Sequence, residues 1–263
     1  MKLILVDLGN TICKICLINE KNRKIIKTLN LKTRDIKNSK NLKRFFKKKK
    51  IISKTFFQRA AFFSSVVPSV YLLFKRFLKK EFGISSFDIK DKRLKKVVKI
   101  NVKYPHQVGS DRIANASAVY KIYKSNCIII DFGTATTFDV VTNKGVYNGG
   151  VIAPGIELSI KNLHQATAQL PLLKLKKVKK IIGKNTVEAM SSGFYWGYLG
   201  LIKNIINGIK KETKKDYKLI CTGGLANLFA KSISSQCTID QSLTIKGIFE
   251  IYKLNKRINL KNV

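Results

Sequence analysis

Three carboxylates in this chain have neighbours that suit chemistry better than surface solvation. Asp7 and Asp131 each follow an apolar run and stand two positions before a glycine, and Asp111 follows Gly109 and Ser110. A glycine lets the backbone approach a phosphate closely, and nearby N–H groups and threonine hydroxyls donate to its oxygens. Carboxylates can hold the cation that neutralises a transferring phosphoryl group, or accept the proton of an attacking hydroxyl. These residue types indicate phosphoryl transfer.

Two of these carboxylates belong to segments with one shared pattern. DLGNT (7–11) and DFGTATT (131–137) each stand between two strand-like apolar runs, so each predicts a hairpin with polar residues at its tip. For one copy alone, an ordinary hairpin turn is an equally good explanation. The repetition, about half a chain apart, favours an internally duplicated protein whose two tips face one another across a cleft.

The length of the chain fits such a duplication. With 263 residues and 45% hydrophobic content, the chain can form two modest cores in domains of about 130 residues each. It contains neither a G-x-x-x-x-G-K-[ST] run nor a G-x-G-x-x-G run. A P-loop and a Rossmann dinucleotide site are therefore not predicted.

Asp111 stands where a loop is predicted to become a helix. Pro105 and Gly109 mark the loop, and apolar residues recur at helical spacing from Ile113 onward. The structural explanation of such a carboxylate is a helix N-cap, which is common. The neighbouring Arg112 favours a second explanation, the acceptor site of a kinase. There the carboxylate takes a hydroxyl proton while the guanidinium and helix N–H groups bind an anionic or polar group.

The formal net charge of +37 suggests nucleic acid or an anionic membrane as a partner. Only eight of the 52 basic residues are arginine, however, and the lysines are spread along the whole chain. Specific readers of phosphates and bases rely on the bidentate geometry of arginine. Runs such as 43–50, 75–80 and 174–180 are interpreted as solvated faces. We expect no specific nucleic-acid partner, and salt-sensitive non-specific binding at most.

The sequence predicts no membrane segment and a cytoplasmic location. No stretch of 18 apolar residues exists, and the N-terminus begins directly with strand-like residues. The five cysteines are an odd number, and Cys13 and Cys16 point to opposite faces of their predicted strand. No second C-x-x-C completes a zinc site, so all five are interpreted as reduced structural thiols.

Eight short segments stand out along the chain. They are DLGNT (7–11), SSVVP (64–68), GSDRIAN (109–115), DFGTATT (131–137), GGVIAPG (149–155), LP (170–171), GKNT (183–186) and TGGLA (222–226). In this order and at compatible spacing, they resemble the type III pantothenate kinases. The similarity covers essentially the whole chain, and GxDR followed by DFGTATT is its most specific part.

The resemblance implies a fold and an activity. That family belongs to the superfamily of acetate and sugar kinases, heat-shock ATPases and actin. The expected fold is α/β, with two ribonuclease-H-like domains (a duplicated mixed sheet flanked by helices) and an interdomain nucleotide cleft, here predicted at 1–115 and 116–263. The implied reaction is ATP-dependent phosphorylation of the primary hydroxyl of pantothenate, the first step of coenzyme A biosynthesis. Magnesium and a monovalent cation, potassium or ammonium, are implied as cofactors.

The resemblance also implies roles for single residues. Asp111 matches the general base, Asp131 the ligand of the monovalent cation, and Thr186 a pantothenate contact supplied by the second subunit of a homodimer. The ATP-binding positions are Asp7, Leu8, Gly9, Asn10, Thr11, Lys14 and Thr134. The pantothenate-binding positions are Tyr104, Gly109, Ser110, Asp111, Arg112 and Thr186.

One position departs from the family pattern. Many members have a substrate-contacting tyrosine where this chain has Val102, and Tyr104 stands two residues later. Either Tyr104 covers the substrate from a shifted loop or the contact is absent, and we expect the affinity for the substrate, not the reaction, to suffer. The alternative function is that of a catalytically weak or inactive family member that acts as a nucleic-acid-binding or regulatory accessory protein.

Overall fold

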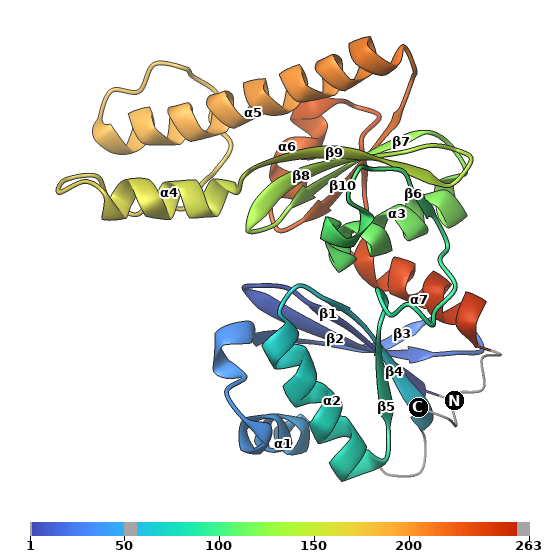
Figure 1. The fold of residues 1–263 in the computed structure, drawn as a ribbon. Coiled ribbons are helices and arrows are strands. Elements are labelled where there is room, and N and C mark those ends of the chain that lie inside the picture. The colour runs from blue at the N-terminus through green and yellow to red at the C-terminus, as the bar shows by residue number, and fades with distance from the viewer. Residues whose placement is uncertain (1, 50–56, 257–263) are drawn as a thin grey trace. The chain divides into compact units, whose positions relative to one another are not determined.

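The computed structural model describes residues 2–49 and 57–256 (Figure 1). Contacts between these residues divide the chain into two compact units. Unit 1 comprises the described residues of 1–99, 103–122 and 243–263, and unit 2 comprises 100–102 and 123–242. The chain therefore returns to unit 1 at its end.

Unit 1 is built on a mixed five-stranded sheet of order β3-β2-β1-β4-β5. β1 pairs antiparallel with β2 and parallel with β4, so the carboxyl ends of β1 and β4 meet at one sheet edge. The strands are β1 (Lys2–Leu8), β2 (Ile12–Asn19), β3 (Ile25–Lys32), β4 (Phe57–Ser65) and β5 (Ser85–Asp88).

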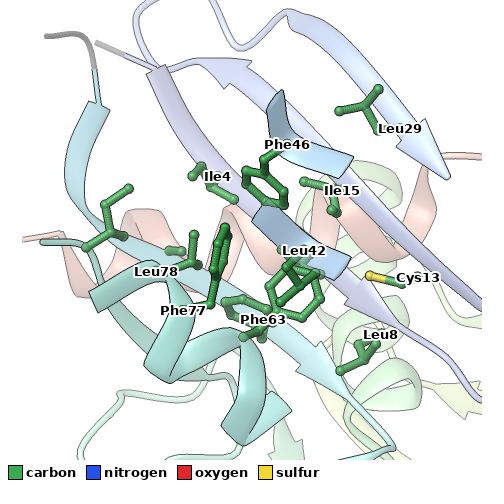
Figure 2. Close-up of a cluster of buried hydrophobic side chains, with 14 of the residues drawn as sticks. Ile4, Leu8, Cys13, Ile15, Leu29, Leu42, Phe46, Phe63, Phe77 and Leu78 are labelled. Atoms are coloured by element: carbon green, nitrogen blue, oxygen red, sulfur yellow. The ribbon is translucent and has the colours of Figure 1, made fainter. Parts of the chain in front are cut away.

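Helices cover both faces of the unit 1 sheet, which is why β1 is apolar at nearly every position. Ile4, Val6 and Leu8 pack against α1 and α2 in the core shown in Figure 2. Successive strand residues face opposite ways, so Asp7 lies on the other face. On that face α7 packs on β1 and β4, with the Tyr252 ring 5.4 Å from that of Phe62. The helices of unit 1 are α1 (Ser39–Lys48), α2 (Pro68–Phe82), α3 (Ser110–Tyr123) and α7 (Leu243–Asn255), with short 3-10 turns at Thr33–Asp35 and Pro105–Gln107.

Unit 2 repeats the strand order of unit 1. Its sheet has the order β11-β10-β7-β8-β9-β6, so that β9-β8-β7-β10-β11 corresponds to β3-β2-β1-β4-β5, and β6 adds an edge. The duplication predicted from the two hairpin motifs is confirmed. The strands are β6 (Lys99–Ile100), β7 (Cys127–Phe132), β8 (Ala135–Val141), β9 (Val146–Pro154), β10 (Lys218–Gly223) and β11 (Thr238–Ile239).

The helices of unit 2 are α4 (Ile156–Gln165), α5 (Thr186–Thr213) and α6 (Ala226–Ile233). They form one core with the sheet, in which Ile130 and Phe132 of β7 pack with Tyr195 of α5 and Phe229 of α6. Figure 1 shows α4 and the N-terminal half of α5 side by side beyond the sheet, joined by residues 166–185. We call α4, this connection and the first turns of α5 the arm.

Most elements lie where the sequence predicts them. The sequence at 244–255 predicts a closing helix, and the structure has α7 there. The lysines and phenylalanines of 32–60 suggest a helix, which is α1 in part, while residues 50–56 lie outside the described residues. Within residues 2–49 and 57–256, no helix combines the length and the apolar character that crossing a membrane requires. The predicted domains 1–115 and 116–263 stay a prediction, because compact packing does not establish which segments fold independently.

Candidate active site

The first predicted phosphate motif forms the turn between β1 and β2. Gly9 N–H donates to the carbonyl of Ile12 at 3.0 Å, and a Cβ on Gly9 would lie 3.1 Å from that oxygen. Thr33 Oγ1 donates to the carbonyl of Gly9 at 2.7 Å and holds the turn from the neighbouring segment. Asn10 and Thr11 are exposed at the tip. This is the predicted geometry, a rigid sheet that presents N–H and hydroxyl groups at its edge.

Asp7 has polar partners in the neighbouring strands. It stands opposite Lys14 of β2 and opposite Ser64 of β4. Directly opposite residues lie on the same face of a sheet, so the three side chains form one polar group behind the turn. Ser64 is 1% exposed, and its Oγ has no hydrogen-bond partner among the residues that the structure describes.

Asp111 lies in the first turn of α3, as predicted. Ser110 is buried, and its Oγ donates to the carbonyl of Ser65 at 2.7 Å, which fixes the start of α3 to the end of β4. Since Leu8 pairs with Ser65, the start of α3 and the first phosphate turn lie at the same edge of the unit 1 sheet. The structure therefore brings Asp7 and Asp111 to one edge.

The carboxylate of Asp111 folds back over Gly109. One of its oxygens, Oδ1, accepts the N–H of Arg112 at 2.8 Å, and a Cβ on Gly109 would lie 2.4 Å from that oxygen. This contact explains the glycine of GxDR, because any side chain there would displace the carboxylate.

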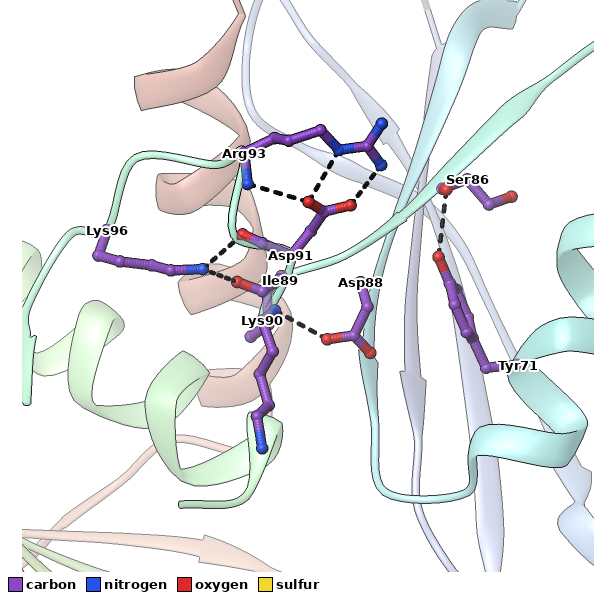
Figure 3. Close-up of polar contacts among 8 residues, drawn as sticks. All are labelled: Tyr71, Ser86, Asp88, Ile89, Lys90, Asp91, Arg93 and Lys96. Atoms are coloured by element: carbon purple, nitrogen blue, oxygen red, sulfur yellow. Dashed lines mark hydrogen bonds and ion pairs between the residues drawn. The ribbon is translucent and has the colours of Figure 1, made fainter. Parts of the chain in front are cut away.

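No sequence pattern indicates the polar contacts that surround Asp88 and Asp91 (Figure 3). Asp88, at the end of β5, accepts the N–H of Lys90 at 2.8 Å and is also hydrogen-bonded to the backbone of Ser65. Burial raises the pKa of Asp88 above its usual value, although these hydrogen bonds and the nearby Lys90 and Lys96 act in the opposite direction. A chain of hydrogen bonds thus runs from Asp88 through Ser65 to Ser110. No motif could reveal it, because it depends on β5 lying beside β4.

The loop after β5 carries an ion pair. Asp91 accepts from Arg93 Nε at 2.9 Å and Nη2 at 2.5 Å, and these hydrogen bonds lower the pKa of Asp91 to about 2. Lys96 Nζ donates to the carbonyls of Ile89 and Asp91 (Figure 3). Lys90 Nζ reaches the carbonyl of His106 at 2.7 Å and links this loop to the segment before α3.

The second phosphate motif forms the turn between β7 and β8. Gly133 N–H donates to the carbonyl of Ala135 at 3.1 Å, and Thr134 is exposed at the tip. Asp131 stands opposite Thr137 of β8 and Thr222 of β10. The arrangement repeats that of Asp7 in unit 1, with a tighter turn.

Two further glycine segments pack against this turn. Gly223 has a φ of +87°, and a Cβ there would lie 2.7 Å from Asp131 Oδ1 and 2.6 Å from the carbonyl of Phe132. A Cβ on Gly155 would lie 2.0 Å from the carbonyl of Thr134. The segments GGVIAPG, DFGTATT and TGGLA, far apart in sequence, therefore meet at one edge of the unit 2 sheet.

A cavity of about 550 Å³ lies beside this edge. One wall is a single face of α4, the other is the chain from Leu172 to Leu175, and Leu225, next to the Gly223–Gly224 turn, closes it. Its lining is mainly apolar, with Glu157, Lys161 and His164 as the polar contributors from α4. Cavities with this character suit a flat organic group with few polar contacts.

The GKNT motif forms the start of α5. Asn185 is its N-cap and accepts the N–H of Glu188 at 2.9 Å, and Glu188 in return accepts the N–H of Lys184 at 2.8 Å. A Cβ on Gly183 would lie 2.3 Å from the backbone N of Ala189. Three residues of the motif thus build the helix start, and Thr186 is left exposed on the arm.

Tyr104 lies in the loop before α3 and is half exposed. Its ring contacts the His106 ring, with centroids 6.2 Å apart, and lies 5.3 Å from Lys103 Nζ. Val102 is grouped with unit 2, where it lies near Gly149. Whether Tyr104 covers a substrate stays a prediction.

The described residues contain no cluster of three or more His, Cys, Asp or Glu side chains that could hold a metal by themselves. Magnesium in phosphoryl transfer is commonly bound through one or two carboxylates and the substrate's phosphates, and the donors at both turns are hard oxygens. The residues present therefore fit such a cation. Asp7 and Asp111 belong to unit 1 and Asp131 to unit 2, so a crevice shared by all three stays a prediction.

Solved structures share the fold at low sequence identity. A protein from Campylobacter jejuni described as a Baf family transcriptional activator matches with a TM-score of 0.62 and 22% identity, over 97% of this chain and 100% of that one. The activator of 2-hydroxyisocaproyl-CoA dehydratase from Clostridium difficile, solved with bound ADPNP, matches with a TM-score of 0.56 and 12% identity, over 100% and 98% of the two chains. These likenesses confirm two ribonuclease-H-like domains and nothing more specific.

Sequence comparison is more specific. The type III pantothenate kinase of Pelagibacter ubique is 46% identical over 257 residues, which are 97% of this chain and 100% of that protein. That of Paramagnetospirillum magneticum is 42% identical over 196 residues, 74% of this chain and 75% of its own length. The family model of type III pantothenate kinase matches residues 3–208. This chain belongs to the type III pantothenate kinase family.

Proposed function

We propose that this chain transfers the γ-phosphoryl group of ATP to the primary hydroxyl of pantothenate, the first step of coenzyme A biosynthesis, in the cytoplasm. The observation that carries the proposal is the position of Asp111. Its carboxylate is folded over Gly109, and the Ser110–Ser65 hydrogen bond places it at the sheet edge where the first phosphate turn ends. A carboxylate held there can take the hydroxyl proton as the alcohol oxygen attacks phosphorus.

The acceptor binds around the start of α3. Arg112 follows the base directly, and its guanidinium together with the N–H groups of the first helical turn suits the carboxylate and polar groups of pantothenate. Tyr104, on the adjoining loop, provides a ring beside the same segment. The net charge of +37 attracts both anionic substrates.

Both turns supply groups that bind the phosphates of ATP. Gly9, Asn10, Thr11 and Lys14 act from unit 1, with Asp7 and Leu8 shaping the turn, and Thr134 acts from unit 2. The adenine base of ATP occupies the cavity beside Leu225, because that cavity opens next to the Gly223–Gly224 turn and is lined mainly by apolar groups.

Asp131 holds the monovalent cation, potassium or ammonium. Its Oδ1 lies close to Gly223 and Gly133, where backbone approaches the carboxylate without a side chain between them. Together with magnesium at the phosphates, such a cation offsets the negative charge of the triphosphate when bound. The residues of this chain supply the oxygen ligands and the orientation.

A second copy of the chain completes the acceptor site. Thr186 is exposed on the arm, where apolar side chains are also exposed, Ile182 at 75%. Exposed apolar surface of this extent marks an interaction site. The other large apolar side chains exposed on the arm or on the adjoining strand β9 are Val151, Ile152, Leu158, Leu163, Leu172, Ile181 and Val187. We assign this surface to a homodimer in which Thr186 of one subunit contacts the pantothenate bound by the other.

The direct test is to incubate the protein with ATP, magnesium and pantothenate and to identify the products by phosphorus NMR. The expected result is 4'-phosphopantothenate and ADP in equal amounts, with turnover that depends on potassium and falls when sodium replaces it. Phosphate release without pantothenate, or no phosphorylated product, would overturn the proposal. Sedimentation in the same buffer is expected to give twice the mass of one chain.

A further inference from the structure

Two thiols of unit 2 lie closer together than any other pair of cysteines in the described part of the chain. The Sγ atoms of Cys221 and Cys237 are 2.8 Å apart. Cys221 is buried on β10, and Cys237 lies one residue before β11 and is partly exposed. The other three cysteines have no such neighbour in the structure: two are hydrogen-bonded only to hydroxyl or carbonyl oxygens, and Cys13 is fully buried.

The backbone already holds these two thiols side by side. β10 and β11 pair in parallel with Cys221 opposite Ile239, two residues after Cys237, and Asp240 N–H donates to the carbonyl of Cys221 at 2.9 Å. Sulfur atoms in a disulfide are about 2.05 Å apart. Closing the remaining gap brings together one side chain on β10 and one in the turn that leads into its hydrogen-bonded neighbour β11.

The two thiols differ in reactivity. The hydrogen bond between them lowers the pKa of Cys237, whereas the same hydrogen bond and burial raise the pKa of Cys221. Since the thiolate is the nucleophile, the partly exposed Cys237 reacts first with a solute and Cys221 stands ready as the second thiol. Burial raises the pKa of Cys13, Cys16 and Cys127, which disfavours their thiolates.

We propose that Cys221 and Cys237 form a reversible modification site, oxidised by hydrogen peroxide to an intramolecular disulfide. The Cys237 thiolate attacks one peroxide oxygen, the O–O bond breaks, and hydroxide leaves, so that Cys237 becomes a sulfenic acid. The sulfur of Cys221 then displaces the hydroxyl group, which leaves as water with the thiol proton. Two thiols and one peroxide thus give one disulfide and two waters, and a small dithiol reverses the change by exchange.

The crosslink would act on the nucleotide turn. The chain between the two cysteines contains Gly223, Gly224 and all of α6. Gly223 lies against Asp131 Oδ1, and Gly224 N–H donates to the carbonyl of Phe132 at 3.0 Å. Tying β11 to β10 therefore constrains both ends of the segment that carries this turn. The effect on ATP binding rests on the proposed function, whereas the modification itself does not.

The test counts thiols in the folded wild-type protein. The reduced chain has five cysteines. After exposure to hydrogen peroxide, unfolding and alkylation, intact mass spectrometry is expected to show three alkylated thiols instead of five, and dithiothreitol is expected to restore five. A tryptic digest is expected to contain the peptide with Cys221 joined to the peptide with Cys237, since Lys231 separates them. This readout needs no enzymatic activity, so its failure is distinct from failure of the kinase assay.

Variants locate the site. Cys237→Ser is expected to keep all four of its thiols under the same treatment, and Cys16→Ser, the matched control, is expected to lose two of its four. The melting temperature of the wild type is expected to rise on oxidation and that of Cys237→Ser to stay unchanged, because the crosslink restricts the unfolded chain. Five alkylated thiols in the treated wild type, overoxidation of Cys237 without a crosslink, or thiol loss that persists in Cys237→Ser would overturn the proposal.

Discussion

At the scale of single residues, the site depends on close contacts that only glycine permits. In the family motif GxDR, the glycine leaves room for the carboxylate two residues later, since a Cβ on Gly109 would lie 2.4 Å from Asp111 Oδ1. In TGGLA, Gly223 does the same for Asp131. Both contacts join a motif glycine to a motif carboxylate, so the motifs describe packing as well as chemistry.

Gly109→Ala is therefore expected to displace the base. The carboxylate must move by about 1 Å to reach ordinary contact, and a misplacement of that size lowers turnover on the order of 10²-fold. The measurement is kcat for pantothenate phosphorylation, with circular dichroism to confirm folding.

Gly208→Ala is the matched control for this substitution. Gly208 lies in the interior of α5, and a Cβ there meets nothing within 4 Å. We expect unchanged turnover and a free energy of unfolding higher by up to about 1 kcal/mol. Near wild-type turnover in Gly109→Ala would remove the steric explanation of the motif.

Among the elements, β4 and β5 position the start of α3 through the hydrogen bonds of Ser65. Asp88→Asn weakens the hydrogen bond to the backbone of Ser65, whose carbonyl holds Ser110. We expect kcat to fall about tenfold with an unchanged KM for ATP, since the base shifts and the phosphate turn does not.

A double-mutant cycle separates positioning from general destabilisation. Asp88→Asn and Ser110→Ala act through one chain of hydrogen bonds. The loss of kcat in the double variant is therefore expected to be smaller than the two single losses combined. Asp35→Asn, on an exposed turn of the same unit, is expected to leave kcat unchanged. Fully additive losses would show that Asp88 does not act through Ser110.

The loop after β5 is expected to respond to acid through Asp91. Arg93 lowers the pKa of Asp91 to about 2, below its value of about 3.9 in an unfolded chain. The stabilisation of the folded chain by the Asp91–Arg93 ion pair is thus fully present above pH 4 and is lost as the pH falls towards 2. Urea unfolding of the wild type and Asp91→Asn is expected to differ at pH 6, and the difference to shrink between pH 4 and pH 2.5. A constant difference across this range would assign the effect to something other than the charge of Asp91.

The sequence predicted the elements that carry repeated or periodic patterns and missed those that depend on assembly. Both hairpins, the start of α3 and the closing helix lie where their patterns place them. Asp88 and the pair Cys221–Cys237 could not be found, because each depends on which strands become neighbours. The roles of Asp131, Thr186 and Tyr104 rest on the family resemblance and stay predictions.

In the molecule as a whole, the two units share one sheet order, and the same hairpin motif lies in each. The order β3-β2-β1-β4-β5 recurs, while the connections differ: unit 2 carries the arm and unit 1 receives α7 from the end of the chain. The repeated part holds the two turns that are predicted to bind phosphate, and the arm of unit 2 holds Thr186, the predicted subunit contact.

The charge of the whole molecule predicts binding to DNA without selectivity. Since the 52 basic residues are mostly lysine, we expect equal affinity for two unrelated duplexes at low salt, and a loss on the order of 10³-fold between 50 and 200 mM salt. Fluorescence anisotropy at several salt concentrations measures both. Tight, sequence-selective binding that persists at high salt would instead favour a regulatory role beside the kinase activity.

In the proposed reaction, Asp111 accepts the proton of the pantothenate hydroxyl. The most direct measurement is kcat of Asp111→Asn with saturating ATP, magnesium, potassium and pantothenate, together with calorimetric affinities for both substrates. We expect a loss of about 10²- to 10⁴-fold in kcat, with the fold and ATP affinity retained. Wild-type turnover in this variant, with its fold intact, would contradict it.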